Sequence, residues 1–365
     1  MEIPFINLKA QYKDLYDEIH NRINQTLSHG QYILGPEIYE LEEKLSEFVG
    51  TKYCVTVGSG TDALMISLMS IGLKPGDEVI TTPFTFVSTA EVIALLGAKP
   101  IFVDIDKDTC NLDPKLIEEK ISKNTKAIMP VSLYGQPADM EQINNIAKKN
   151  NLIVIEDAAQ SFGSTYRGKS SCNLSDIGCT SFFPSKPFGC YGDGGAIFTS
   201  DENLANVMKE IRVHGQKERY VHSRVGLGGR MDSIQAGILL AKLPNFNWEI
   251  EERLKIGSRY DKFFDERGVD RIHQKEDRTS VYAQYTIIVE EREDLQNFLQ
   301  KKGVPTAIHY PISLNEQKPY IPFCCPECTP ISLEISKKVL SLPMSAYLEK
   351  HDQDYIFDAL LEFFK

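Results

Sequence analysis

The sequence predicts an α/β protein with a large domain on a seven-stranded, mostly parallel sheet and a smaller α+β domain after it. Two observations predict this class. Between residues 53 and 199, short apolar runs alternate with stretches of helical periodicity, as in a parallel sheet covered on both faces. After residue 232 the pattern changes to a long charged helical stretch and then to mixed strand and helix. We therefore expect the large domain to occupy residues 1–232 and the small domain residues 233–365.

The chain opens with helices. Residues 8–27 have helical periodicity, and Gly30 after them is a typical C-terminal cap. A second helix is expected over residues 37–48. The turn-rich connector between the two helices contains Tyr32.

The strands and helices of the large sheet follow. Each predicted strand is an apolar run that is short for a helix and is bounded by polar residues or glycine. The expected strands are 53–57, 78–82, 99–105, 126–132, 152–156, 178–183 and 195–199. The helices expected between them are 61–72, 88–96, 114–121 and 139–149.

The small domain begins with a long charged helix over residues 233–267, which Pro244 is expected to interrupt or kink. A strand, a helix, a second strand and a final helix are expected after it. Their ranges, in that order, are 282–290, 292–302, 306–310 and 352–364.

Composition narrows the class of partner. The chain has 365 residues and a formal net charge of −11, which disfavours nucleic acid or an anionic membrane as the main partner. No apolar run is long enough to span a membrane, and the first residues do not form a signal peptide. We therefore expect a cytoplasmic protein.

The eight cysteines are expected to be reduced thiols, because no secretory signal precedes them. Cys324, Cys325 and Cys328 resemble half of a metal site. No second Cys/His pair at zinc-finger spacing accompanies them, so we expect a surface loop and no metal.

The stretch from Leu152 to Lys186 carries the chemistry. Asp157 ends one predicted strand and Lys186 follows the next, and function in open α/β sheets lies at the carboxyl ends of strands. An acid that pairs with a pyridine nitrogen and a lysine that forms a Schiff base are the two anchors of a pyridoxal phosphate site. The pair predicts such a site, although either residue alone is more often an ordinary solvated or ion-paired side chain.

A second motif, Gly58-Ser59-Gly60-Thr61-Asp62-Ala63, follows a strand and opens a helix. Backbone N–H groups and the positive end of the helix dipole make this turn a phosphate cradle. The same letters fit a degenerate Rossmann fingerprint, which predicts an oxidoreductase instead. A Rossmann site needs an acid at the end of the second strand, whereas Asp77 and Glu78 precede that strand. This favours the phosphate cradle.

Together the motifs EDAAQS-x-G, SFFPSK and GDGGAI resemble the DegT/DnrJ/EryC1/StrS sugar aminotransferases, which are fold-type I pyridoxal phosphate enzymes. The resemblance extends almost from end to end, from Phe5-Ile6-Asn7-Leu8 to Ser341-Leu342-Pro343-Met344. It implies a cytoplasmic enzyme that carries an amino group from L-glutamate, released as 2-oxoglutarate, to a keto group of a nucleotide sugar. It also implies a homodimer whose active sites are completed across the interface.

The resemblance implies roles for individual residues around the cofactor, pyridoxal 5'-phosphate. Gly60, Thr61 and Ser181 would hold its phosphate. Phe86, rather than the nearby Phe84, would lie on its ring. Asp157 would pair with the ring nitrogen, Gln160 would reach the 3′ oxygen, and Lys186 would be the catalytic lysine. The sugar dehydratases on this scaffold have histidine in place of the lysine, so Lys186 favours transamination.

Further residues are implied for the substrate and the partner subunit's site. The segment containing Gly228 and Arg230 would enter that site, where Gly228 replaces an asparagine that commonly binds the cofactor phosphate. Arg230 would bind a carboxylate. Tyr32, His309 and Tyr310 would lie near the sugar nucleotide, although each also has an ordinary structural interpretation.

The motifs GQYILGPE, PVSLYGQ, SCNLS and HYPI are most similar to bacterial members that aminate C3 of UDP-2-acetamido-2-deoxy-3-oxo-D-glucuronate. Those members serve the synthesis of surface polysaccharides such as lipopolysaccharide O-antigen. Three alternatives remain open at this point. They are C4 amination of a 4-keto-6-deoxy sugar, a Rossmann oxidoreductase, and a non-catalytic sensor on the same scaffold.

Overall fold

The central element of the protein is a seven-stranded sheet. The computed structural model describes residues 3–364. The strand order is β1-β9-β8-β5-β4-β2-β3, and only β9 runs antiparallel to its neighbours. The strands are β1 (Tyr53–Val57), β2 (Glu78–Thr81), β3 (Lys99–Phe102), β4 (Thr125–Ile128), β5 (Ile153–Asp157), β8 (Ile177–Ser181) and β9 (Gly195–Thr199). The predicted seven-stranded, mostly parallel sheet is confirmed.

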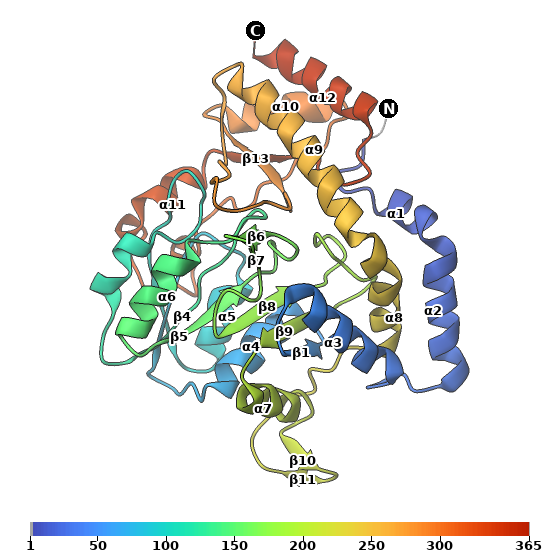
Figure 1. Cartoon of the computed structure of the whole chain (residues 1–365). Coiled ribbons are helices and arrows are strands. Elements are labelled where there is room, and N and C mark those ends of the chain that lie inside the picture. Colours follow the sequence, from blue (N-terminus) through green and yellow to red (C-terminus); the bar gives the residue numbers. More distant parts are fainter. Residues whose placement is uncertain (1–2, 365) are drawn as a thin grey trace.

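Helices cover both faces of this sheet (Figure 1). They are α3 (Pro36–Val49), α4 (Gly60–Ser70), α5 (Ser88–Leu95), α6 (Met140–Lys149), α7 (Glu202–Arg212) and α8 (Ser233–Lys242). Both faces are buried, so successive side chains of a strand enter different cores. In β1, Val55 and Val57 pack with α4 and α7, whereas Cys54 packs with α3. In β5, Ile155 faces α4 and Val154 faces α6. The sheet is therefore the middle of three layers.

Two predicted helices differ from the observed ones. The stretch 8–27 forms two helices, α1 (Leu8–Asp14) and α2 (Tyr16–His29), because the chain leaves helical geometry at Leu15. The stretch 114–121 forms two single turns, η1 (Pro114–Leu116) and η2 (Glu118–Lys120). The first prediction had the right element type but missed the break, and the second stretch forms 3-10 turns in place of the expected helix.

The long charged helix is interrupted where its proline predicts. The helix α8 ends at Lys242, the turn η3 (Leu243–Asn245) contains Pro244, and α9 (Phe246–Asp265) continues beyond it. Proline at the second position of η3 has no N–H to contribute to a continuous helix. The interruption lets α8 pack on the large sheet while α9 reaches the upper part of the molecule (Figure 1).

The C-terminal lobe is built on a small antiparallel sheet. It consists of β12 (Asp270–Arg271), β13 (Tyr285–Ile288) and β14 (Val339–Leu342), covered by α9, α10 (Arg292–Lys301) and α12 (Lys350–Phe363). The predicted strand 306–310 is wrong. Only a single bridge, between Ala307 and Ser341, joins that segment to the sheet. The sequence pattern did not reveal β14, which takes the pairing position beside β13.

Shorter elements lie outside the two sheets. A hairpin formed by β10 (Gln216–Glu218) and β11 (Val221–His222) follows α7 and projects from the bottom of the molecule (Figure 1). The others are the hairpin β6 (Thr165–Tyr166) and β7 (Lys169–Ser170), the turns η4 (Leu314–Glu316) and η5 (Pro326–Cys328), and the helix α11 (Pro330–Ile335).

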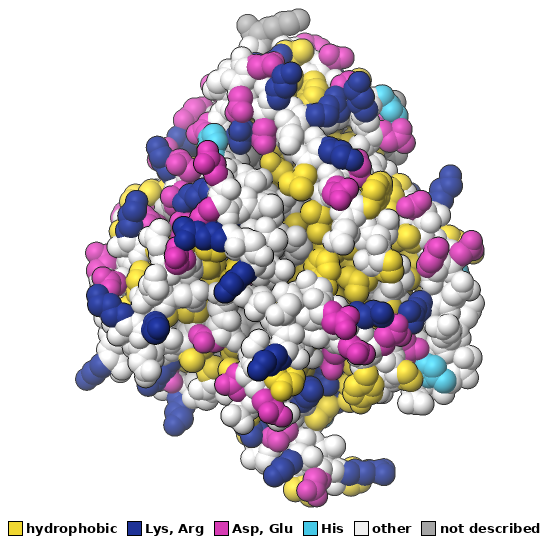
Figure 2. Space-filling view, in the orientation of Figure 1, with side chains coloured by type: hydrophobic (Ala, Val, Ile, Leu, Met, Phe, Trp, Pro, Cys, Tyr) yellow, Lys and Arg dark blue, Asp and Glu magenta, His cyan; other side chains and the backbone are white. Residues whose placement is uncertain are grey.

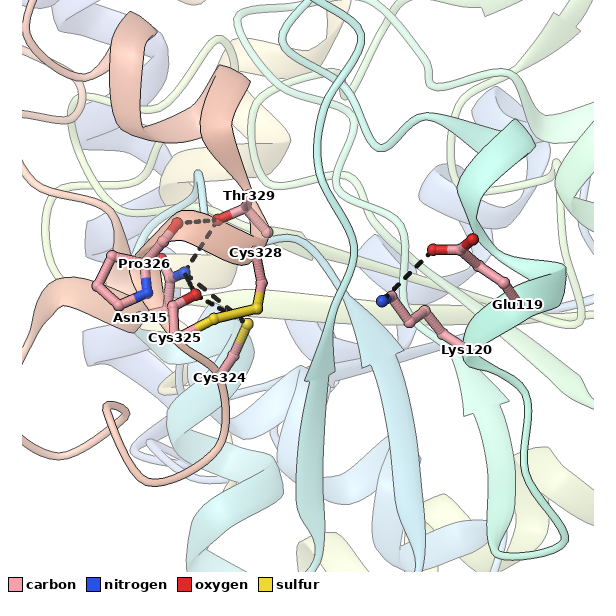
Figure 3. The surroundings of a disulfide bond; sticks show 8 residues. All are labelled: Glu119, Lys120, Asn315, Cys324, Cys325, Pro326, Cys328 and Thr329. Carbon is pink, nitrogen blue, oxygen red and sulfur yellow. Dashed lines mark hydrogen bonds and ion pairs between the residues drawn. A yellow bond between two sulfur atoms is a disulfide. The ribbon is translucent and has the colours of Figure 1, made fainter.

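Cys325 and Cys328 form a disulfide, which corrects the expectation of eight reduced thiols (Figure 3). Spacing alone did not show that the turn η5 brings these two Cα atoms to 5.5 Å from each other. Cys324 is a partly exposed free thiol beside them. Asn315 holds the turn by donating from Nδ2 to the Cys325 carbonyl at 3.1 Å and to Thr329 Oγ1 at 2.9 Å.

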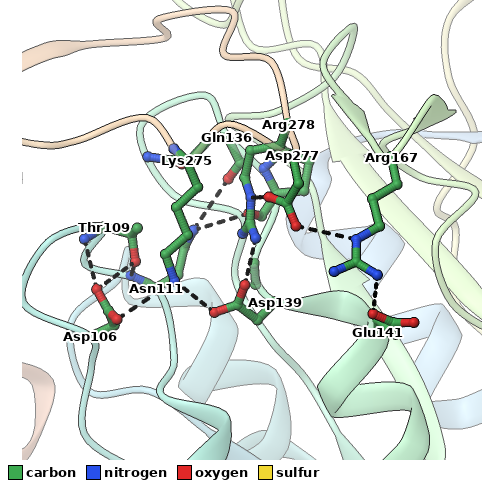
Figure 4. A network of polar contacts seen from close by, with 12 residues as sticks. Asp106, Thr109, Asn111, Gln136, Asp139, Glu141, Arg167, Lys275, Asp277 and Arg278 are labelled. Atoms are coloured by element: carbon green, nitrogen blue, oxygen red, sulfur yellow. Dashed lines mark hydrogen bonds and ion pairs between the residues drawn. The ribbon is translucent and has the colours of Figure 1, made fainter.

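A polar network joins the segment before β13 to the loops of the large sheet (Figure 4). Lys275 Nζ lies 2.9 Å from Asp139 Oδ2. The Arg278 side chain is 1% exposed and is paired with both Asp139 and Asp277. A buried cation is tolerated only when its charge is paired in this way, so the network fixes how segment 275–278 lies on the large sheet.

The surface seen in Figure 2 carries Lys and Arg side chains interspersed with Asp and Glu side chains. Within residues 3–364, no helix has both the length and the apolar character that crossing a membrane requires.

Candidate active site

A cavity of about 490 Å³ lies at the carboxyl ends of the parallel strands, with the small lobe along one side. Most of the residues singled out in the sequence line this cavity. They are Gly60, Thr61, Phe86, Asp157, Gln160, Ser181, Lys186, His309 and Tyr310. Strands β1, β2, β5 and β8 bring the first seven to one edge of the sheet, as the rule for open α/β sheets predicts.

Asp157 is the last residue of β5 and is 5% exposed. Its Oδ2 accepts a hydrogen bond from Thr89 Oγ1 at 2.8 Å, and its Oδ1 accepts one from the Ala159 N–H at 3.2 Å. Burial raises the pKa of Asp157, whereas these two hydrogen bonds and the charge of Lys186 lower it. The carboxylate form is therefore favoured by specific donors in an environment that otherwise opposes charge.

Lys186 lies in the turn that follows β8, where its backbone N–H donates to the Phe183 carbonyl at 2.6 Å. Burial lowers the pKa of Lys186, and the charge of Asp157 acts in the opposite direction. A neutral amine is the nucleophilic and basic form of lysine. The cavity thus favours the form that chemistry at this position requires.

Gly60 begins α4 and faces Ser181 across a very short gap. A Cβ atom at Gly60 would lie 2.6 Å from the Ser181 Cβ atom, so only glycine fits without moving β8. Ser59 caps the helix, because its Oγ accepts from the Asp62 N–H at 3.0 Å. The N–H groups of Gly60 and Thr61 have no partner within the helix and can hold an anion.

Gln160 and Tyr310 join the large sheet to the small lobe. Gln160 is 3% exposed, and its Oε1 accepts from the Tyr134 N–H at 2.8 Å. Its Nε2 donates to the Tyr310 hydroxyl at 3.1 Å. Burial raises the pKa of Tyr310, so the hydroxyl keeps its proton. Both predicted residues therefore belong to one hydrogen-bonded unit of the cavity wall.

His309 faces the cavity from the small lobe. Its Nδ1 lies 3.0 Å from Ser341 Oγ on β14. Burial, followed by the charge of Lys186, lowers the pKa of His309 to about 4. The imidazole is therefore neutral at physiological pH and presents a hydrogen-bonding group without a charge.

Two neighbouring phenylalanines differ in exposure. Phe86 is 53% exposed and lines the cavity, and its ring centroid lies 6.3 Å from that of Tyr310. Phe84 is completely buried. Phe86, rather than Phe84, therefore offers an aromatic face to a planar ligand in the cavity.

Tyr32, Gly228 and Arg230 do not line the cavity. The Tyr32 carbonyl accepts from the Ser233 N–H at 2.9 Å, at the start of α8. A Cβ atom at Gly228 would lie 3.5 Å from an Arg230 guanidinium nitrogen. The Gly58 N–H donates to the Gly229 carbonyl at 2.9 Å, so the segment with Arg230 runs beside the turn that leads to Gly60 without lining the cavity.

Several cavity residues were missed by the sequence analysis. Thr89 on α5 holds the Asp157 carboxylate, and no sequence motif marked this contact between residues 68 positions apart. Gln284 lines the cavity from the small lobe, where a polar residue inside the apolar run 281–289 marks it. Phe183 and Asp193 also line the cavity, and the SFFPSK and GDGGAI motifs contain them.

Metal ligation has no support in the described part of the chain. Among residues 3–364, no group of three or more His, Cys, Asp or Glu side chains is arranged to hold a metal ion.

A helix N-terminus, a buried acid and a buried lysine around one cavity of an α/β sheet are the arrangement that a pyridoxal phosphate enzyme requires. The model of the DegT/DnrJ/EryC1/StrS aminotransferase family matches residues 13–361. The chain belongs to this family.

Three relatives show how far the similarity extends. The chain is 54% identical over 349 residues to the UDP-2-acetamido-2-deoxy-3-oxo-D-glucuronate aminotransferase of Pseudomonas aeruginosa, covering 95% of this chain and 96% of the relative. It is 41% identical to the pleiotropic regulatory protein of Geobacillus stearothermophilus, covering 100% of this chain and 99% of the relative. The crystal structure of NtdA from Bacillus subtilis with bound cofactor PMP superimposes with a TM-score of 0.91 at 31% identity, covering 100% of this chain and 85% of that one.

His309 should remain neutral through the physiological pH range. We expect the ¹⁵N NMR signals of its imidazole to change only near pH 4, far below the ordinary value of about 6.5. The unfolded chain then binds more protons than the folded chain between these two values, so this residue's contribution to stability is lost as the pH falls from 6.5 towards 4. His309→Asn identifies the signals, and a titration midpoint near 6.5 would contradict the expectation.

Proposed function

We propose that this protein is a pyridoxal phosphate-dependent aminotransferase that converts UDP-2-acetamido-2-deoxy-3-oxo-D-glucuronate to its 3-amino sugar, with L-glutamate as donor. The observation that carries the reaction class is the placement of Asp157 and Lys186 in one cavity beside the N-terminus of α4. The substrate is supported by the Pseudomonas relative, which is similar over nearly its whole length.

The residues present fit pyridoxal phosphate. The Gly60 cradle suits a phosphate, since a side chain at this position would collide with Ser181. Phe86 offers a face for the ring, and Asp157 is held as an acceptor by Thr89. When bound, the cofactor supplies an electron sink that stabilises negative charge at the substrate carbon.

The chain's own residues perform the remaining tasks. Lys186 Nζ would hold the cofactor and, as a neutral amine, would take and return the proton of the reacting carbon. Asp157 would offer a carboxylate oxygen to the protonated ring nitrogen. Gln160 would reach the cofactor's 3′ oxygen from a position that Tyr134 and Tyr310 fix.

We also propose that the protein is a homodimer, in which Gly228 and Arg230 of one copy complete the cavity of the other. Two observations support this. Both residues lie outside the cavity of their own chain, and no arginine is among the described residues that line it. Tyr220, Val221 and Val225, on and after the projecting hairpin, are 78%, 54% and 84% exposed, as expected of residues that meet a partner.

We further propose that the chain divides into two domains between residues 232 and 233 and that it acts in the cytoplasm. We also propose that its product is used to make surface polysaccharide such as lipopolysaccharide O-antigen. The long C-terminal lobe with its own core supports the division. The motif resemblance supports the other two, and cell fractionation together with polysaccharide analysis of a deletion strain tests them.

The purified protein should show the visible absorption band of lysine-bound pyridoxal phosphate. Borohydride should abolish the band, L-glutamate should remove it, and Lys186→Ala should lack it, because Lys186 is the one lysine among the described residues that line the cavity. Lys169→Ala, an exposed lysine on β7, is the control and should keep the band. A colourless protein in the presence of added cofactor would contradict the proposal and favour a sensor, a possibility consistent with the regulatory name of the Geobacillus relative.

The pyridoxamine-loaded enzyme should accept the 3-keto uronic acid in preference to a 4-keto-6-deoxy sugar nucleotide. Arg230 gives the reason, because a guanidinium pairs with the sugar carboxylate, and a charged pair is worth about 1.5–3 kcal/mol. Arg230→Met should therefore reduce kcat/KM for the 3-keto uronic acid by about 10- to 100-fold. Equal or greater activity on 4-keto sugars would support C4 amination instead.

The active species should be a dimer. Size-exclusion chromatography with light scattering should give twice the mass of 41.2 kDa for one chain. Mixing a Lys186→Ala protein with an Arg230→Met protein should restore activity, because one of the two shared sites is then intact. An active monomer, or no restoration on mixing, would contradict the shared site.

A further inference from the structure

Gln284 lines the cavity but performs none of the tasks that the proposed reaction assigns to Lys186, Asp157 and Gln160. It directly precedes β13, whose first residue, Tyr285, pairs with Leu342 and is 2% exposed. Successive side chains of an extended chain point in opposite directions, so Gln284 faces away from the Tyr285 ring. It lines the cavity together with His309 and Lys186.

The Gln284 amide lacks a protein partner at one end. Its Oε1 is buried and has no hydrogen-bond partner within residues 3–364. A buried amide without a partner is uncommon in a folded protein. No hydrogen bond from its Nε2 is formed within residues 3–364 either, so the amide has an unused donor while the residue lines the cavity.

The backbone around Gln284 is fixed from both lobes. The Val281 N–H donates to the Gly135 carbonyl at 3.0 Å, and Arg253 donates to the Tyr282 carbonyl at 3.1 Å. A Cβ atom at Gly135 would lie 2.6 Å from the Tyr282 nitrogen, so the two segments are in close contact. Backbone contacts of the neighbouring residues therefore fix the position of Gln284 at the cavity wall, whereas its side-chain Oε1 has no hydrogen-bond partner within residues 3–364.

We propose that Gln284 is a specificity-determining residue whose amide hydrogen-bonds an oxygen substituent next to the carbon that gains or loses the amino group. The inference rests on the proposed function, because the reacting carbon must lie at Lys186. Gln284 and His309 are neutral hydrogen-bonding groups that line the same cavity as that lysine. Two ligands have an oxygen next to the reacting carbon that the Gln284 amide could bind. In glutamate it belongs to the α-carboxylate, and in the keto sugar it belongs to a ring substituent.

The test compares Gln284→Leu with Gln300→Leu, a matched change at an exposed glutamine on α10 of the same lobe. Each half-reaction is followed separately by absorption, first with L-glutamate and then with the keto sugar nucleotide. UDP-glucuronic acid is titrated as an unreactive probe of the sugar nucleotide. We expect the apparent dissociation constant of one ligand to rise about tenfold in Gln284→Leu, because one hydrogen bond is lost. The same constant should be unchanged in Gln300→Leu.

The ligand whose apparent dissociation constant rises is the one that carries the oxygen bound by Gln284. A change in the glutamate arm alone assigns the α-carboxylate, and Gln284→Glu should then weaken glutamate further through repulsion of like charges. A change in the keto sugar and UDP-glucuronic acid arms assigns the sugar. The absorption band and the circular dichroism spectrum show that each variant is folded and loaded. Gln284→Glu has nearly the size of the original residue and replaces Gln284→Leu if the latter does not fold.

Values within about twofold of the unsubstituted enzyme in both arms would overturn the inference. That outcome differs from failure of the proposed function. If the function is wrong, the unsubstituted enzyme itself gives no absorbance change with glutamate or the keto sugar, whereas the inference fails only when that enzyme reacts normally.

Discussion

The site depends on the burial of one acid and one amine in the same cavity. Burial raises the pKa of Asp157 and lowers the pKa of Lys186, so dry surroundings favour the neutral form of each. The charge of each group offsets part of the pKa shift that burial causes in the other, because opposite charges attract strongly where water is excluded. The sheet produces this arrangement directly, since Asp157 ends β5 and Lys186 follows the adjacent parallel strand β8. The charged acid therefore depends on the donors that surround Asp157, whereas burial alone favours the neutral lysine.

The contacts that fix Asp157 and Gln160 include residues from elements far apart in the chain. Thr89 on α5 fixes one oxygen of Asp157, and Gln160 is fixed by Tyr134 and by Tyr310 of the small lobe. The small lobe is consequently part of the site as well as a cover for it. The network of Lys275, Arg278 and Asp139 holds the segment before β13 on the large sheet, which limits how far the lobes separate (Figure 4). Positions within the cavity are thus set by contacts between lobes.

The features that could be predicted from the sequence are those that depend on the local pattern of apolar, polar and glycine residues. Apolar runs located all seven strands of the large sheet, and the motifs around Asp157 and Lys186 located the cavity. Features that depend on tertiary pairing were missed. Segment 306–310 has the composition of a strand, yet β14 occupies the position beside β13. The Cys325–Cys328 disulfide requires the turn η5, and the unpartnered amide of Gln284 requires knowledge of every neighbouring donor. No pattern of residue types encodes such an absence.

Gly228 poses a question of affinity that the geometry of the cradle helps to answer. Glycine at this position provides no side chain for a phosphate, and Gly228 lies outside the cavity of its own chain. The donors available within the chain are the N–H groups at the start of α4 and the Ser181 hydroxyl, all supported by the close contact of Gly60 with β8. Backbone donors held this rigidly lose little entropy on binding, and the helix dipole adds to their effect. In the proposed site, such a cradle would bind phosphate without the asparagine, and a side chain at Gly228 would first meet His214, whose Cε1 lies 3.1 Å from the position of a Cβ atom there.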